Sequence, residues 1–461
     1  MDLGKYLGVP LIHRRVTKAT YAYLLEQIDK RLNGWAASYL SLAGRVTLAK
    51  SVLQAVPIYS MQSNWLPKGV CMEIERRIRR FIWGRSNGAN GISLVNWDLM
   101  QRPTDCGGVG LRNMECQNQA FLLKLGHQLI SNGDRLWVRI LRAKYKWEGP
   151  LPCSIRRANC SRLWRGISVL WDEVYNSVCW NIRDGMDTDF WYDTWIAGVG
   201  PLAPYFTGVG DPAPCNVASM AFPTGQWDFS RMSVLLPDSI LYRISAIRPP
   251  QSLLGTDAPS WRWTNSQNFS SKVAYDRVAR EGDWVRHTDW KVLWKMNVPQ
   301  RIRMFLWLAK SEKLLTNKER VRRHLTASPC CSICFAAEES VIHVLRDCVV
   351  AGNTWRRLVR PGKLVEFMAL PFDEWLMRNL RGGEGFALDA AGWGVLFPTM
   401  CWTLWKTRCK QVMEPDSGVV SDPFFVGHQL AAAYAASAAD GAKLSLPAPP
   451  PLVSICRKTL A

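Results

Sequence analysis

The chain has 461 residues, of which 48% are hydrophobic, and it carries 58 Lys and Arg against 38 Asp and Glu, a net charge of +20. This length suggests two to four domains, and the basic balance points to polyanionic partners, either nucleic acid or an acidic membrane surface. A basic protein whose charges are simply solvated is the alternative. Because no signal-type N-terminus and no run of about 18 apolar residues is found, we expect no membrane contact and a nuclear or cytoplasmic location.

Residues 1–150 read as a basic helical region, with 22 Lys or Arg against 10 Asp or Glu. Apolar residues recur at helical spacing over 20–35, 41–56 and 69–85, and Thr20 precedes the first run as a capping residue. In the third run Ile74 and Ile78 share one face. The arginines on its other faces are candidate phosphate contacts, although a solvated surface role is equally open for each: Arg76, Arg77, Arg79 and Arg80.

The stretch Cys106–Asn113, "CGGVGLRN", is rich in glycine. It lacks the third glycine of a dinucleotide-binding loop, and no clear strand precedes it. We interpret it as a turn before the next helix rather than a phosphate-binding loop.

Residues 151–265 form a Trp-rich connection in which helical periodicity fades. Asp184-Gly185 lies between two strand-like runs and predicts a local hairpin within 179–195. The stretch 259–275 predicts a further strand pair that leads into a helix. The 23 tryptophans of the chain could stack on bases, but anchoring small cores is the favoured interpretation.

Residues 266–360 contain the pattern Cys331-x₂-Cys334-x₈-His343-x₄-Cys348. A Cys-x₂-Cys turn offers two thiolates to one Zn²⁺, and a short helix that carries His343 would complete the set. Four protein ligands leave no position for a reactive water, so the pattern predicts a structural Zn²⁺ site. Cys330 could replace Cys331, and buried reduced cysteines beside an incidental histidine are the other alternative.

The approach to this cluster, residues 288–325, is helical and carries ten Lys or Arg against three Asp or Glu. Its arginines are further candidates for nucleic-acid binding: Arg301, Arg303, Arg320, Arg322 and Arg323. We expect a helical linker over 361–415 and, from the Ala- and Pro-rich composition, a disordered tail over 416–461.

Several long motifs resemble one protein family. "LNGWAASYLSLAGRVTLAKSVLQAVPIYSMQ" and "LPKGVCMEIERRIRRFIWG" resemble the region downstream of the palm in reverse transcriptases of plant non-LTR (LINE-type) retroelements. "CSICFAAEESVIHVLRDC" resembles the zinc-binding domain that follows there. The likeness covers roughly residues 4–410. It implies a fold that is mainly α with a smaller α+β part: a helical thumb-like region, the Trp-rich connection and a small zinc-stapled domain.

The family's polymerase carries an aromatic-x-Asp-Asp motif upstream of "YLGVPL", and this chain has no Asp-Asp pair. "ADGAKL" has at most a weak similarity to the start of a ribonuclease H domain. We therefore expect no catalytic residues and no enzyme activity of its own. The leading hypothesis is a non-catalytic fragment that binds RNA or DNA with low sequence specificity, and another chain could supply the polymerase domain. The alternatives are a truncated RNA-directed DNA polymerase, with or without ribonuclease H, and a protein-interaction scaffold reused by the host.

Overall fold

The structure is a computed structural model that describes residues 5–6, 9–10, 17, 19–34, 40–84, 91–131, 133–279, 284–383, 385–390, 392–413 and 421–443. Its secondary structure is mostly helical with few strands, as expected from the sequence. The chain divides into two compact units. Unit 1 comprises 1–35, 50–78 and 112–283, and unit 2 comprises 36–49, 79–111 and 284–461.

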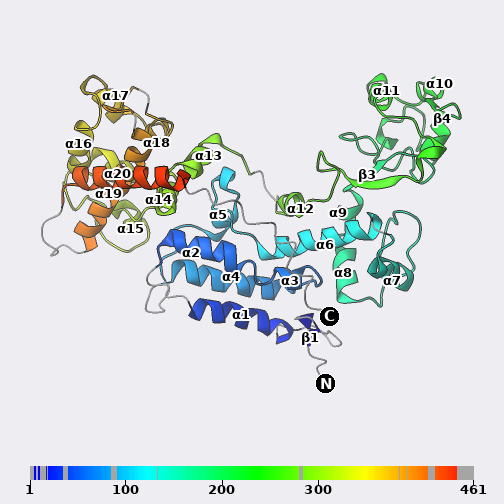
Figure 1. The fold of residues 1–461 in the computed structure, drawn as a ribbon, viewed down its shortest axis with the longest axis horizontal. Helices are drawn as coiled ribbons and strands as arrows, with labels where there is room; N and C mark the ends of the chain where they lie inside the picture. The colour runs from blue at the N-terminus through cyan, green and yellow to red at the C-terminus, as the bar shows by residue number, and fades with distance from the viewer. Residues whose placement is uncertain are drawn as a thin grey trace. The chain divides into compact units, whose positions relative to one another are not determined.

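Unit 1 is organised around one long buried helix, α6, which packs against α8, α9 and α12 (Figure 1). Apolar and aromatic side chains from these helices and from the strands form its core. The helices of this unit are α1 (Ala22–Asn33), α3 (Ile58–Met61), most of α4 (Lys68–Trp83), α6 (Met114–Ser131), α7 (Leu136–Lys144), α8 (Arg162–Val169), α9 (Trp171–Tyr175), α10 (Phe229–Met232), α11 (Asp238–Ser245) and α12 (Ser271–Val278).

The strands of unit 1 pair in antiparallel, two-stranded sheets. The strands are β1 (Lys5–Tyr6), β2 (Val9–Pro10), β3 (Val178–Asn181), β4 (Ala221–Phe222), β5 (Gln226–Trp227) and β6 (Ala258–Trp261). β1 pairs with β2, β4 with β5, and β3 with β6, so that Val178 faces Trp261 and Asn181 faces Ala258.

The local hairpin predicted within 179–195 is therefore wrong. The ladder partner of β3 lies about eighty residues further on, and toward the predicted partner β3 makes a backbone hydrogen bond from Trp180 N to Thr194 O but no ladder. The buried Asp257 carboxylate explains the turn, since it accepts hydrogen bonds from the amides of Arg183 and Gly185. Gly185 has φ 70° and lies against Ala218, where a Cβ would not fit.

Unit 2 is a helical assembly in which α14 lies against α2 and α19. An aromatic cluster forms part of its core: Trp355, Phe367, Trp375, Trp393 and Phe397. The helices are α2 (Leu42–Leu48), α5 (Trp97–Gln101), α13 (Thr288–Lys295), α14 (Gln300–Lys310), α15 (Asn317–Arg322), α16 (Val349–Arg356), α17 (Leu364–Ala369), α18 (Phe372–Leu380), α19 (Trp393–Met413) and α20 (Pro423–Lys443).

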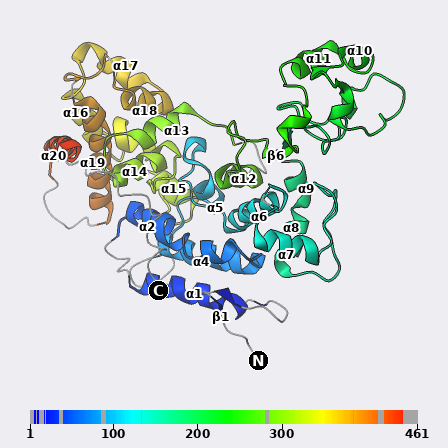
Figure 2. The same cartoon turned by 45° about the vertical axis from the view of Figure 1, so that its right-hand side comes forward.

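Two other predictions about the ends of elements need correction. The helix α20, which packs against α19, occupies 423–443, so the disorder expected over 416–461 is wrong for that stretch (Figure 2). Alanine is the strongest helix former, and here it lies beside an apolar partner helix. The tail beyond residue 443 lies outside the described residues. Thr20 does not cap α1, whose N-cap residue is Tyr21.

The structure confirms three interpretations of the sequence. Gly107 and Gly110, with φ 83° and 74°, form a turn before α6. Ile74 and Ile78 are fully buried on α4. Tryptophans serve the cores, since seven of them are among the largest fully buried side chains: Trp164, Trp171, Trp261, Trp307, Trp355, Trp375 and Trp393. Among the described helices, none has the length and apolar character required to cross a bilayer.

Candidate metal centre

Cys331 and Cys334 lie on a tight turn closed by backbone hydrogen bonds. The amide of Cys331 donates to Ala337 O at 2.9 Å, and the amide of Phe335 donates to Cys331 O at 3.0 Å. Phe335 has φ 55°, so the chain reverses directly after the second cysteine. This geometry points both thiols to the same side of the turn.

The other two candidate ligands lie at the two ends of one turn of π-helix, His343–Asp347. His343 is its first residue, and Cys348 follows its last residue. The hydroxyl of Ser340 accepts a hydrogen bond from His343 N at the start of this turn. The amide of Cys348 donates to His343 O at 2.7 Å, and Cys348 is the N-cap residue of α16. The prediction that a short helix carries His343 and ends before Cys348 is confirmed, with a π-helical rather than an α-helical turn.

The four side chains converge on one point. One ligand atom from each of Cys331, Cys334, His343 and Cys348 lies within 4.8 Å of all the others. The sulfurs of Cys331 and Cys348 are 3.9 Å apart, and Cys334 Sγ is 3.4 Å from His343 Nε2. A tetrahedral Zn²⁺ with ordinary bond lengths separates two sulfurs by about 3.8 Å and a sulfur from a nitrogen by about 3.5 Å. The donor set therefore fits the ion in both chemistry and spacing.

Cys330 stands apart from this group. Its side chain is exposed, and it forms an isolated bridge with Glu338. The structure thus brings together the set that contains Cys331 and leaves Cys330 outside it. Within the described ranges, this is the one group of three or more His, Cys, Asp or Glu side chains arranged to hold a metal.

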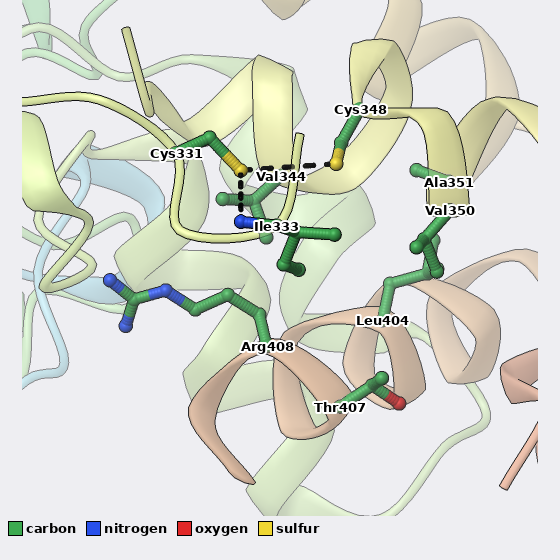
Figure 3. A pocket seen from close by; sticks show the side chains of 9 residues that line it. All are labelled: Cys331, Ile333, Val344, Cys348, Val350, Ala351, Leu404, Thr407 and Arg408. Carbon is green, nitrogen blue, oxygen red and sulfur yellow. Dashed lines mark hydrogen bonds between the residues drawn. The ribbon is translucent and has the colours of Figure 1, made fainter. Parts of the chain in front are cut away.

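The site is closed on the side that faces α19. Figure 3 shows Cys331 and Cys348 above Ile333, Val350 and Leu404, with a hollow of only about 10 Å³ between them. Such a space holds about one water molecule. Burial raises the pKa of the Cys348 thiol to about 12, whereas the backbone amide of Ala336 lowers the pKa of Cys334. A metal ion would displace the thiol protons on binding.

A buried ion pair between Arg408 and Glu339, which the sequence pattern did not reveal, packs next to the Cys-x₂-Cys turn and stabilises it. Arg408 of α19 pairs with Glu339, and their side chains are 2% and 0% exposed. The same carboxylate accepts the amide hydrogen of Asn317, and the Asn317 side chain donates to Cys330 O at 2.8 Å. In Figure 3 the Arg408 guanidinium points away from the sulfurs, so it positions the turn and does not contact the ligands.

Many of the arginines proposed for nucleic-acid binding already have partners within the protein. Arg76 and Arg77 pair with Glu73, and Arg322 and Arg323 pair with Glu319. The remaining nominated arginines have different contacts or exposure. Arg79 lies over the Trp97 ring, and Arg80 is exposed. Arg301 donates to the Tyr434 hydroxyl, Arg303 to Gln300 and Arg320 to Asn317. Two of the paired arginines have second partners, since Arg77 also pairs with Asp29 and Arg323 donates to Ser93 O and Leu94 O.

Comparison with known proteins agrees with this site. A family model described as zinc-binding in reverse transcriptase matches residues 269–355. A protein of Arabidopsis thaliana named "Putative ribonuclease H protein" is 32% identical over 416 residues, which are 88% of this chain and 66% of that protein. An uncharacterised mitochondrial protein of the same plant is 31% identical over 152 residues, which are 32% of this chain and 98% of that protein.

Fold, site and relatives together define a mostly helical protein with a Cys₃His zinc-type module. The chain belongs to the plant retroelement proteins related to reverse transcriptase, which confirms the resemblance found in the sequence. It spans slightly less than two thirds of the length of the first of these relatives. The division into domains at residues 150, 265, 360 and 415 stays a prediction.

Proposed function

We propose that this chain is a non-catalytic, nucleic-acid-binding part of a retroelement reverse transcriptase, and that one structural Zn²⁺ binds Cys331, Cys334, His343 and Cys348. The observation that carries the proposal is the closed Cys₃His group, whose spacing fits tetrahedral Zn²⁺. When bound, the ion cross-links a turn and a helix end that are too short to form a core of their own.

The zinc part of the proposal predicts about one Zn²⁺ per purified chain. Cys334→Ser removes one ligand, so the metal content should fall to near zero and hydrogen exchange over 317–356 should quicken. Cys330→Ser is the matched control, since it removes an exposed neighbouring thiol outside the group. Elemental analysis by mass spectrometry provides the measurement. Equal loss of zinc in the two variants, or a native chain without zinc, would contradict the assignment.

The nucleic-acid part rests on charge. A net charge of +20 favours polyanions, and contacts between Lys or Arg and phosphate give low sequence specificity. This sequence has no Asp-Asp pair of the kind that could hold catalytic metal ions, and we propose that it acts together with a polymerase domain.

Binding of labelled single-stranded RNA and DNA should weaken at least tenfold between about 50 and 200 mM salt, since released counterions drive such complexes. Fluorescence anisotropy measures this. The same protein, given a primed template, Mg²⁺ and nucleotides, should extend no primer. An affinity independent of salt, or measurable extension, would contradict the proposal. Stoichiometric zinc without any nucleic-acid binding would favour the interaction scaffold instead.

A further inference from the structure

A further group of basic residues, none of them among the arginines nominated from the sequence, lies in unit 1. Residues 135–165 contain nine Lys or Arg against one carboxylate, Glu148. The segment comprises α7, the following loop and the first turn of α8, and Figures 1 and 2 both show these two helices side by side. Both helices also pack on α6, so a rigid helix supports the segment.

Three of the nine cations have structural roles. Arg142 donates to Leu129 O and Ile130 O at the end of α6, Arg157 donates to Tyr145 O and Lys146 O, and Arg162 donates to Trp65 O. The other six are exposed: Arg135, Arg139, Lys144, Lys146, Arg156 and Arg165. In the part of the chain that the structure describes, none of these six forms an ion pair with a carboxylate. They therefore differ from Arg76, Arg77, Arg322 and Arg323, which already form ion pairs with Glu73 or Glu319.

A hollow of about 320 Å³ lies between the end of α7 and the start of α8. Of the six exposed cations, Lys146 lines it, while Lys144 and Arg156 are next in sequence to the lining residues Tyr145 and Ile155. Beneath the surface of the hollow, the buried rings of Tyr145 and Trp164 stack with their centroids 4.2 Å apart, and Ile155 lies beside them. The half-buried Trp147 and the cation Arg157 also line the hollow, together with Pro152, Ser154 and one exposed carboxylate, Glu148.

Hydrogen bonds hold this hollow in shape without a ligand. Trp164 Nε1 donates to Ile155 O, and Trp147 Nε1 donates to Gly149 O, each at 2.8 Å. The Tyr145 hydroxyl accepts the amide hydrogen of Ser161, the N-cap residue of α8. Arg157 fixes the loop at Tyr145 and Lys146, as described above. A preformed site loses little entropy on binding.

We propose that this hollow takes one unpaired nucleotide of single-stranded RNA or DNA, with neighbouring phosphates held by Lys144, Lys146 and Arg156. The half-buried Trp147 ring at the hollow offers a surface on which any base can stack, and exposed cations beside it can contact a phosphate backbone. Aromatic rings combined with cations are the usual arrangement of sites for single strands. The volume lies at the lower end of ligand pockets and suits one nucleotide. A duplex keeps its bases stacked inside and would leave the hollow empty. The proposal rests on the nucleic-acid binding put forward above and assigns it a place.

The test uses the full chain and fluorescence anisotropy with a 20-nucleotide single strand, a duplex of equal length and a single strand of abasic sites. The native protein should bind the normal single strand about tenfold more tightly than either of the others, because only it offers a base to stack. This arm needs no variant, so it cannot fail through misfolding.

Charge removal supplies the second arm. Lys144→Gln, Lys146→Gln and Arg156→Gln combined should weaken binding at least tenfold and reduce the slope of log affinity against log salt by about two, at about 0.7 for each phosphate contact. The matched control removes three cations that already lie in exposed ion pairs, Lys68→Gln, Arg286→Gln and Lys363→Gln, and should change the affinity less than threefold. Thermal melting checks that both triple variants fold.

The outcomes separate this inference from the proposed function. A native chain that binds no oligonucleotide, or binds only vesicles of acidic lipid, overturns both. Binding that is equal for normal, abasic and duplex strands overturns the assignment of the nucleotide to this hollow and leaves nucleic-acid binding in place. Binding that survives loss of Lys144, Lys146 and Arg156 but not of the control set does the same.

Discussion

At the scale of single residues, charge pairing decides which basic side chains remain available to a polyanion. Glu319 shows the effect: its carboxylate accepts hydrogen bonds from both Arg322 and Arg323. These contacts lower the pKa of Glu319 to about 2, with the bond to Arg322 as the largest cause. Two arginines that have no evident partner in the sequence thus share the carboxylate of Glu319, one helical turn away.

This pairing predicts a pH-dependent stability. A carboxyl whose pKa is lowered by folding stabilises the protein above its ordinary pKa, and that contribution disappears as pH falls through its folded value. Glu319→Gln should therefore cost about 2 kcal/mol of unfolding free energy at pH 7, allowing for solvent around the exposed Arg322. The difference from the native chain should shrink between about pH 4.5 and 2.

Urea denaturation at several pH values measures this difference. Glu312→Gln is the control, since Glu312 is exposed and lies in the same unit. A difference between native and Glu319→Gln chains that stays constant with pH would disprove the assignment of the lowered pKa to folding.

At the scale of elements, the pair Arg408–Glu339 makes α19 part of the metal-binding module. The matched family region ends at residue 355, but the carboxylate of Glu339, next to the Cys-x₂-Cys turn, has its cation on α19. Asn317 at the start of α15 joins both. Three segments distant in sequence therefore share one buried polar network beside the candidate metal centre.

Breaking this pair should be costly because the surviving charge would stay buried. Glu339→Gln or Arg408→Met should each lower the unfolding free energy by about 3–5 kcal/mol and weaken zinc binding, whereas the double variant should recover part of the loss. Denaturant unfolding and zinc titration measure both effects. In the exposed pair Lys363–Glu366, Lys363→Met should cost less than about 1 kcal/mol. Additive losses in the double variant would show that the two residues do not act as a pair.

At the scale of the whole molecule, the basic side chains behind the net charge of +20 are not equally available to bind a polyanion. Arg76 and Arg77 on α4 share the carboxylate of Glu73, and Arg322 and Arg323 share that of Glu319. The six exposed cations of 135–165 form no ion pair among the described residues. Net charge therefore indicates the class of partner, and only the pairing pattern indicates where that partner would bind.

Much of the fold was predictable because helices follow from local periodicity. Ile74 and Ile78 predicted the buried face of α4, and the cysteine spacing predicted a group that the structure brings within 4.8 Å. The pairing of β3 with β6 was not predictable, since a short strand carries no record of its distant partner, and the Asp184-Gly185 turn is held by Asp257 instead. The helix α20 was missed because its composition resembles a disordered tail until its packing on α19 is known.

The sequence by itself determined the class of protein, the helical character and the four candidate ligands, because each depends on residue type and on spacing along the chain. The tertiary structure decided the rest. It placed Cys331 and not Cys330 in the metal group, it brought Arg408 to Glu339 beside that group, and it determined which of the nominated arginines form ion pairs with carboxylates. These properties depend on distances between segments far apart in the chain, and such distances exist only after folding.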